Sequence, residues 1–189
     1  DVVAGRTPLE GEGAELLAEV LEVLDHELPH HLEQTIEPAV DHLAPPFLAE
    51  MAHYEWVELA LDIAAEVLPD AVAIEDVLAV VPRLSPLAWS LSYRFPVHRI
   101  GPRFRPLDAA EPTYLVVYRN REDQVRFMAL NATTARLLEK VKGNNGDTVG
   151  GLLVGLASEL DMPVESILAF GGEQFRELIA LAVVLVTQQ

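Results

Sequence analysis

The amino-acid sequence predicts an α+β protein, with an N-terminal α-helical domain over residues 1–84 and a small winged-helix-like domain over residues 85–189. Apolar residues recur at helical spacing through the first part. In the second part, two runs of alternating apolar and polar residues flank a polar turn, as in a β-hairpin. Three helix-length segments follow the hairpin, which is the outline of a winged helix-turn-helix. The 189 residues, half of them hydrophobic, are enough to bury a core in one domain or in two small ones.

The front part of the chain is expected to consist of helices that end at prolines. Residues 1–13 contain several glycines and form a flexible lead-in. The helical segments that follow span residues 14–28, 30–43 and 47–67. The last of them carries a broad apolar face, so we expect a core helix that buries Trp56. Residues 70–81 are expected to form a short helical or irregular piece, and Pro82 and Pro86 bound a linker into the second domain.

The second domain is expected to begin with a strand over residues 87–94 and a basic arm over residues 94–106. Three prolines stiffen the arm, so we expect it to be extended and to display its side chains instead of burying them. The hairpin spans residues 113–130 around a turn at residues 120–124, with one face open to water. The remaining elements are helices over 132–141, capped by Asn131, over 148–160, capped by Asp147 or Thr148, and over 163–180, and then a short strand over 183–186.

Charge is distributed unevenly along this acidic chain, whose net charge is −17. Residues 1–82 hold 19 acidic residues against one Arg, residues 83–142 hold 11 basic against 5 acidic residues, and residues 143–189 hold 6 acidic residues against one Arg. Basic charge therefore belongs to the arm and the hairpin. A protein that binds duplex DNA needs Lys and Arg to displace phosphate counterions, so the acidic balance disfavours nucleic acid as a partner.

Composition also excludes several kinds of site. The chain has no Cys, which rules out disulfides, thiol nucleophiles and Cys-based metal sites and fits a reducing cytoplasm. The longest apolar run, residues 178–186, is far shorter than the ~20 residues of a membrane-spanning helix, and no signal peptide is visible. We therefore expect a cytoplasmic protein with no membrane partner.

Two patterns that suggest catalysis fail on inspection. His26 and His30 flank a Glu at metalloprotease spacing, but Pro29 breaks the regular helix that two ligands four residues apart require. The serines lack a nucleophile elbow, and the glycine-rich stretch 143–151 lacks the Lys-Ser or Lys-Thr ending of a phosphate-binding loop. We expect no catalytic residue, no metal site and no cofactor.

The arginines of the arm admit two interpretations. Arg94, Arg99, Arg103 and Arg105 can dock on the acidic front helices, with Glu55 and Glu58 as partners, or form an exposed site for an anion or a partner. The aromatic residues of the hairpin are typical of cross-strand packing, and a free edge beside them can accept a peptide strand. The residues predicted to contact a partner or a peptide are His98, Arg99, Arg103, Phe104, Arg105, Tyr114, Val116, Tyr118, Arg119 and Arg126.

Three stretches carry a resemblance to a known family: residues 45–56, 95–106 and 125–131. Over residues 45–189 the chain resembles the HvfC/BufC-type family, bacterial proteins long described as DNA-binding domain proteins. The resemblance implies non-catalytic partners of a multinuclear non-haem iron enzyme that modifies Cys residues of a ribosomally made precursor peptide. The part from Tyr114 onward resembles a peptide-recognition element, a winged-helix module that holds a leader peptide along its hairpin edge and third helix. Residues 1–44 are shorter and more acidic than the family's usual front.

Together these features predict a cytoplasmic adaptor that is not an enzyme. Its expected partners are a multinuclear non-haem iron enzyme and a Cys-containing precursor peptide, as the resemblance implies. The alternative is a DNA-binding transcriptional regulator that uses the helix-turn-helix-like C-terminal domain. A third reading, a metal-dependent hydrolase, would use His26 and His30.

Overall fold

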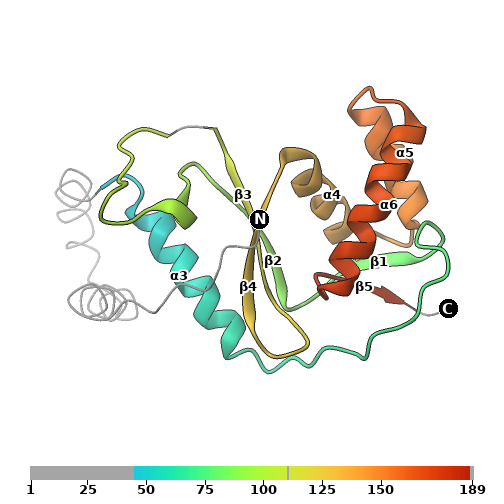
Figure 1. The fold of residues 1–189 in the computed structure, drawn as a ribbon, viewed down its shortest axis with the longest axis horizontal. Helices are drawn as coiled ribbons and strands as arrows, with labels where there is room; N and C mark the ends of the chain where they lie inside the picture. Colours follow the sequence, from blue (N-terminus) through green and yellow to red (C-terminus); the bar gives the residue numbers. More distant parts are fainter. Residues whose placement is uncertain (1–44, 110, 188–189) are drawn as a thin grey trace, which may run out of the picture. The chain divides into compact units, whose positions relative to one another are not determined.

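The computed structural model describes residues 45–109 and 111–187, in which helices combine with small antiparallel sheets. The predicted α+β class is therefore confirmed (Figure 1). The elements are α3 (Leu48–Asp62), β1 (Val81–Leu84), β2 (Ala88–Tyr93), the 3₁₀ turn η1 (Val97–Arg99), β3 (Thr113–Arg119), β4 (Val125–Leu130), α4 (Ala132–Lys142), α5 (Val149–Glu159), α6 (Val164–Ala180) and β5 (Val184–Thr187). The predicted lead-in, the first two predicted helices, and His26 and His30 lie outside the described residues.

The chain divides into two compact units that interleave in sequence. The described part of the first unit comprises residues 57–92 and 113–187, and that of the second comprises residues 45–56 and 93–112 without residue 110. Helix α3 and strand β2 each contribute residues to both units. The domain boundary placed between residues 84 and 85 from the sequence stays a prediction.

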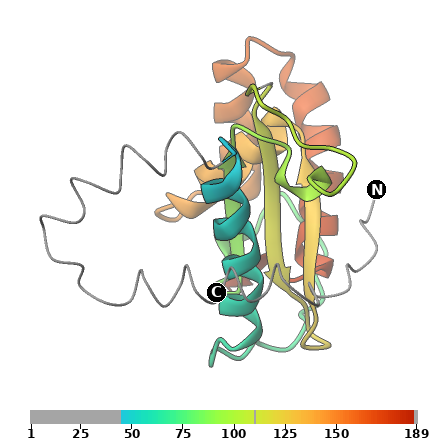
Figure 2. The same cartoon turned by 90° about the vertical axis from the view of Figure 1, so that its left-hand side faces the viewer.

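The hairpin of β3 and β4 is the framework of the first unit. The strands pair antiparallel with Tyr114 opposite Leu130 and Arg119 opposite Val125, side by side as Figure 2 shows in yellow. The turn between them is where the sequence placed it: the Asn120 side-chain oxygen accepts hydrogen bonds from the backbone N–H groups of Glu122 (3.0 Å) and Gln124 (2.9 Å). Strand β3 lies in the middle of the sheet, whose order is β2-β3-β4.

Both faces of β3 are covered, so the prediction of one wet face is wrong for this strand. Successive side chains of a strand point to opposite faces. Val116 and Tyr118 enter the larger core, which is formed with α4, α5 and α6, and Val117 enters a smaller core with Val57 and Leu61 of α3. Covering on both faces explains the nearly continuous apolar run of this strand, which a half-exposed strand would not carry.

Helices α4, α5 and α6 follow the sheet as predicted. The Asn131 side chain accepts a hydrogen bond from the Thr134 N–H at 2.8 Å, and the Thr148 hydroxyl accepts one from the Gly151 N–H at 3.2 Å, so both predicted caps are confirmed and Thr148 is the cap of α5. Pro163 stands immediately before α6. These caps fix where each helix begins.

Two strands close the first unit, and the sequence predicted only the second. Strand β1 pairs antiparallel with β5, with Arg83 opposite Leu185 and Leu84 opposite Val184. The sequence predicts a linker here because Pro82 and Pro86 flank the segment. Pro82 is tolerated because its missing N–H lies on the side of β1 that does not pair with β5; its carbonyl accepts a hydrogen bond from the Asn144 side chain at 3.0 Å.

The buried face of α3 differs from the predicted one. Trp56 is 45 % exposed, and Leu48, Leu59 and Ile63 are also exposed. The buried residues are Tyr54, Val57 and Leu61, which follow the i, i+3, i+7 pattern of one helix face. Apolar residues occur on both sides of this helix, so periodicity alone could not select the face that packs. Trp56 is therefore not the core residue that the sequence suggested.

The packing of α5 against α6 depends on Gly171. A Cβ at this position would lie under 3.0 Å from both Cδ atoms of Leu153, whose side chain is fully buried. We expect Gly171→Ala to lower the free energy of unfolding by about 1–3 kcal/mol, as overpacking does. Gly155 on α5 is the matched control, because a Cβ there meets nothing within 4 Å. Gly155→Ala should raise stability by about 0.5–1 kcal/mol through helix propensity alone. Equal effects in urea unfolding would contradict this packing.

An ion cluster joins α4 to α5 at the surface. Arg136 donates a hydrogen bond to the Glu159 carboxylate, and the Lys140 ammonium lies 2.8 Å from its other oxygen. The hydrogen bond from Arg136, followed by that from Lys140, lowers the pKa of Glu159 from 4.5 to about 2. Because the folded-state pKa is lowered, the stabilisation is present above pH 4.5 and is lost as the pH falls towards 2.

We expect Glu159→Gln to flatten the dependence of the melting temperature on pH between about 4.5 and 2, because the side chain at position 159 then has no carboxylate to protonate in that range. Glu122→Gln, in the exposed hairpin turn, is the control and should retain the wild-type slope. Melting curves recorded at low ionic strength measure both variants, since salt screens surface pairs. A Glu159→Gln slope equal to that of the wild type would show that the cluster does not contribute.

Candidate partner-binding surface

The basic arm is anchored through its apolar residues, which is a correction to the freely displayed arm expected from the sequence. Phe95, Val97 and Ile100 are each at most 2 % exposed. Between them the chain forms the turn η1, and the backbone groups of Gly101 and Phe104 then bond to each other at 3.1 and 3.0 Å. The arm is therefore a folded loop with a fixed shape, whose arginines point outward from a buried apolar base.

Glu50 in the first turn of α3 fixes the start of the arm. One carboxylate oxygen accepts a hydrogen bond from Arg94 Nε at 3.0 Å, and the other accepts one from the Phe95 backbone N–H at 3.0 Å. Arg94 therefore does dock on a front helix, but its partner is Glu50 and not Glu55 or Glu58. The Glu50 carboxylate is largely shielded from solvent, but the Arg94 side chain is 73 % exposed. The ion pair therefore fixes where the arm begins and adds little to the free energy of unfolding.

A cluster of aromatic rings supports this anchor. The Tyr93 hydroxyl lies 2.9 Å from Nδ1 of His53, and the Tyr93 ring meets Tyr54 edge-on at 6.4 Å between centroids. Burial, followed by the nearby Tyr54 and the Glu50 carboxylate, raises the pKa of Tyr93 well above its ordinary value. The hydroxyl therefore stays neutral and serves as a hydrogen-bonding group.

The outer surface of the arm brings together five of the predicted site residues: His98, Arg99, Arg103, Phe104 and Arg105. Arg99, Arg103 and Arg105 are exposed, and no carboxylate of the described residues pairs with them. The Arg99 guanidinium lies 5.3 Å from the centre of the Phe104 ring, which is 39 % exposed. The His98 ring nitrogen Nδ1 is buried without a partner, and burial, then Arg99, lowers the pKa of this side chain. The arm thus presents cations and one aromatic ring on a stable loop.

The predicted hairpin residues belong to the other unit, and three of them are interior. Val116 is fully buried, Tyr118 is 6 % exposed and Arg119 is 8 % exposed. Tyr114 and Arg126 are half-buried, and the Arg126 guanidinium donates to the Gln124 side chain. Burial, the largest cause, raises the pKa of Tyr118. Of the five hairpin residues predicted to contact a partner, Tyr114 and Arg126 retain the most side-chain surface.

Arg119 closes the end of α3. Its Nη1 lies within hydrogen-bond distance of the carbonyl oxygens of Leu61 (3.1 Å), Asp62 (3.0 Å) and Ala64 (2.8 Å), and its Nη2 donates to the Glu66 carbonyl at 2.7 Å. The carbonyls of Leu61 and Asp62 have no helical partner because α3 ends there, at the negative end of its dipole, and those of Ala64 and Glu66 follow the helix. Arg119 is therefore a capping residue, held at the end of β3.

We expect Arg119→Met to lower the free energy of unfolding by about 2–4 kcal/mol, because it leaves one buried and three part-buried carbonyls without their donor. Arg126→Met, on the neighbouring strand, removes the same charge from a half-exposed side chain and should change stability by at most about 0.5 kcal/mol. Urea unfolding of the two variants measures the difference. Equal losses would show that the carbonyl contacts of Arg119 do not stabilise the folded protein.

Sequence reasoning missed Glu50, and no local pattern marks it, because the groups that it binds lie 44 and 45 positions away. Within residues 45–109 and 111–187, His, Asp and Glu side chains form no group of three suited to hold a metal ion. No helix in the same described ranges has the length and apolar character needed to cross a membrane.

The fold and the arm define a class of protein: a sheet covered by three helices, joined to a loop that presents basic and aromatic side chains. Comparison with protein families then identifies it further, because residues 85–179 match the model of the HvfC C-terminal domain. This match covers half of the chain, so the protein belongs to the HvfC family, as its sequence motifs indicated. Membership fits the general role of a partner protein. A comparison with curated proteins finds no match.

Proposed function

We propose that this protein is a cytoplasmic, non-catalytic adaptor in ribosomal peptide modification. In this role it binds a multinuclear non-haem iron enzyme and a Cys-containing precursor peptide, and the enzyme performs the oxidative chemistry. The observation that carries the proposal is the exposed arm, in which Arg99, Arg103 and Arg105 have no carboxylate partner among the described residues. Family membership supports the general role.

The chemistry of the arm suits recognition of an acidic polypeptide surface. Exposed cations increase the rate and orientation of encounter more than the affinity. Affinity needs a group that loses water on binding, and the Phe104 ring, backed by the Arg99 guanidinium, is such a group. A fixed loop loses little conformational entropy when it binds, because the apolar base of the arm is already ordered.

We place the precursor peptide of this proposal at β4 in the first unit. In the order β2-β3-β4, this strand has an unpaired edge among the described strands. An extended peptide can add to such an edge through backbone hydrogen bonds. The sheet followed by α4, α5 and α6 has the outline of a winged helix, and this supports the same assignment by analogy with the peptide-recognition elements that the sequence resembles.

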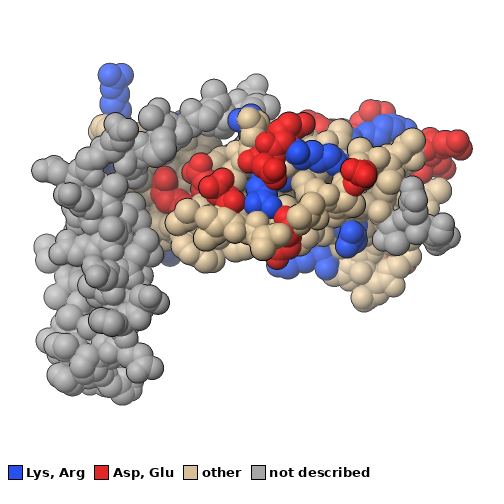
Figure 3. Space-filling model, turned by 90° about the horizontal axis from the view of Figure 1, so that it is seen from below, with Lys and Arg blue, Asp and Glu red and all other residues tan. Residues whose placement is uncertain are grey.

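The alternative, a DNA-binding regulator, has less physical support. A recognition helix at the position of α6 would bring Glu165, Glu173 and Glu177 to the phosphates, against Arg176 alone. On the face seen in Figure 3, the basic and acidic side chains of the described residues are interspersed and form no broad basic surface. Binding of duplex DNA to this face would therefore release few counterions and gain little affinity from them.

The proposal predicts that the genes beside the one for this chain encode an iron enzyme and a short Cys-containing peptide. The enzyme and the peptide should form a complex with the purified protein.

We expect Arg103→Glu combined with Arg105→Glu to weaken that complex by at least about tenfold, because charge contacts at the interface are lost. Both side chains are exposed, so the melting temperature should not change. Titration by calorimetry measures the binding.

The matched control is Arg83→Glu combined with Lys142→Glu, which changes the net charge equally at two exposed positions outside the arm. This control should bind as the wild type does. No complex at about 10 µM, a weak affinity by any standard, would contradict the adaptor role. Sequence-specific binding of duplex DNA that persists at moderate salt would support the DNA-binding regulator instead.

A further inference from the structure

The described part of the chain begins at the base of the arm. Phe47 is buried, and its ring meets the Phe95 ring edge-on at 6.4 Å between centroids. Three residues further on, Glu50 bonds to Arg94 Nε and to the Phe95 backbone N–H. All four residues belong to the second unit. The segment that precedes Phe47 in the sequence is therefore tethered beside the arm.

That segment and the arm carry opposite charge. Residues 14–43 lie outside the described residues, and their sequence holds eight acidic side chains and no Lys or Arg. The arm over residues 94–106 holds four Arg and no acidic side chain. Because the two stretches are parts of one chain, their attraction acts at the high effective concentration of a tethered ligand.

The outward arginines of the arm have no competing carboxylate close by. Arg99, Arg103 and Arg105 form no ion pair within the described part of the chain. Asp108, the acidic residue nearest to them in the sequence, is exposed and does not pair with them. These three guanidinium groups can therefore accept carboxylates from elsewhere without breaking an existing pair.

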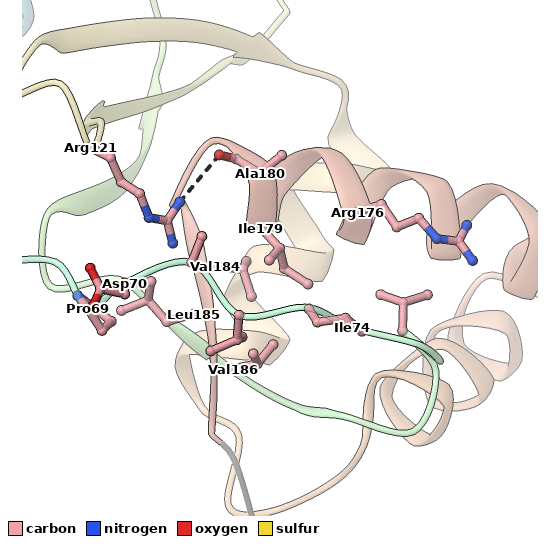
Figure 4. Close-up of a pocket in the computed structure, with 13 residues that line it drawn as sticks. Pro69, Asp70, Ile74, Arg121, Arg176, Ile179, Ala180, Val184, Leu185 and Val186 are labelled. Carbon is pink, nitrogen blue, oxygen red and sulfur yellow. Dashed lines mark hydrogen bonds between the residues drawn. The ribbon is translucent and has the colours of Figure 1, made fainter.

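The first unit offers no comparable group of cations. In the hollow that Figure 4 shows, Arg121 donates to the Ala180 carbonyl, and Arg176 is paired with Glu173. Asp70 lines the same hollow, so its charge is mixed. Among the described residues, three cations without a carboxylate partner occur close together in the sequence only in the arm.

We propose that residues 14–43 are an intramolecular competitor for the arm. Their carboxylates pair with Arg99, Arg103 and Arg105 when no partner is bound, and an acidic partner must displace them. The competitor lowers the apparent affinity of a partner in proportion to the fraction of time for which the arm is open. A partner that offers charge alone gains little from this exchange, so the segment favours partners that also contact Phe104. The regulatory consequence rests on the proposed function of the arm, whereas the contact itself does not.

The binding test uses the full chain and fluorescein-labelled hexaglutamate at about 50 mM salt, followed by fluorescence anisotropy. The segment variant carries four substitutions: Glu15→Gln, Glu19→Gln, Glu22→Gln and Asp25→Asn. It should bind the probe at least about fivefold more tightly than the wild type, because the arm is open for more of the time. This gain should vanish when Arg103→Glu and Arg105→Glu are added.

The matched control makes the same change of net charge at four exposed positions of the first unit: Glu75→Gln, Glu122→Gln, Glu139→Gln and Glu165→Gln. It should bind the probe as the wild type does, because these positions lie outside the segment. An unchanged affinity of the segment variant, or an equal gain in the control, would overturn the proposal.

A distance measurement tests the contact without a ligand. The chain has no Cys, so Ala18→Cys can carry a single nitroxide label on the predicted acidic face of the segment. Relative to the reduced label, the nitroxide should broaden the backbone amide signals of residues 99–105, and about 1 M salt should diminish the effect. Absence of broadening, or broadening of an unlabelled chain mixed with a labelled one, would refute an intramolecular contact.

The same proteins separate this inference from the adaptor function. If the broadening occurs but neither the iron enzyme nor the precursor peptide binds, the contact stands and the proposed function fails. If the enzyme binds the segment variant and the wild type equally well, the competitor is refuted and the adaptor function stands.

Discussion

The first unit depends on a buried guanidinium, that of Arg119, which joins the three-stranded sheet to the end of α3. Helix α3 has no basic residue in its last turn, so its final carbonyls lack a local partner. Arg119 supplies one from 53 to 58 positions further along the chain. Removing a guanidinium from water is costly, and here several carbonyls at the negative end of a helix dipole offset that cost. The position of the end of α3 is therefore set by the end of β3.

This constraint decides which surfaces remain for recognition. Because β3 is central and covered on both faces, its side chains serve the two cores and not a ligand. Among the described strands, a partner can reach backbone only at a strand edge such as that of β4. The arm follows the same logic in the other unit, where buried Phe95, Val97 and Ile100 fix a loop whose cations stay in water. In both units, a buried apolar framework determines where the exposed groups lie.

Local signals predicted most of the elements, and non-local contacts account for most of the errors. The polar turn between two strand-length segments placed the hairpin, and the side chains of Asn131 and Thr148 placed two helix starts, because the physics of these features acts within a few residues. The buried face of α3 and the strand β1 depend on partners far along the chain, so no local pattern reveals them. Basic character alone also cannot separate Arg119, which caps a helix, from Arg103, which faces solvent. The one available signal is that Arg119 shares a strand face with Val117.

The position of basic charge within an acidic chain limits what the arm can recognise. At physiological ionic strength, screening reduces charge effects beyond about 8 Å, so the net charge of −17 and the local charge of the arm act on different scales. A long, uniformly charged polymer such as duplex DNA interacts with the arm and with the acidic rest of the chain, which repels it. A folded protein or a short peptide with a few carboxylates meets only the arm. Selection among such partners then depends on contacts that exclude water, and Phe104 beside Arg99 is the part of the arm where cation and apolar surface coincide.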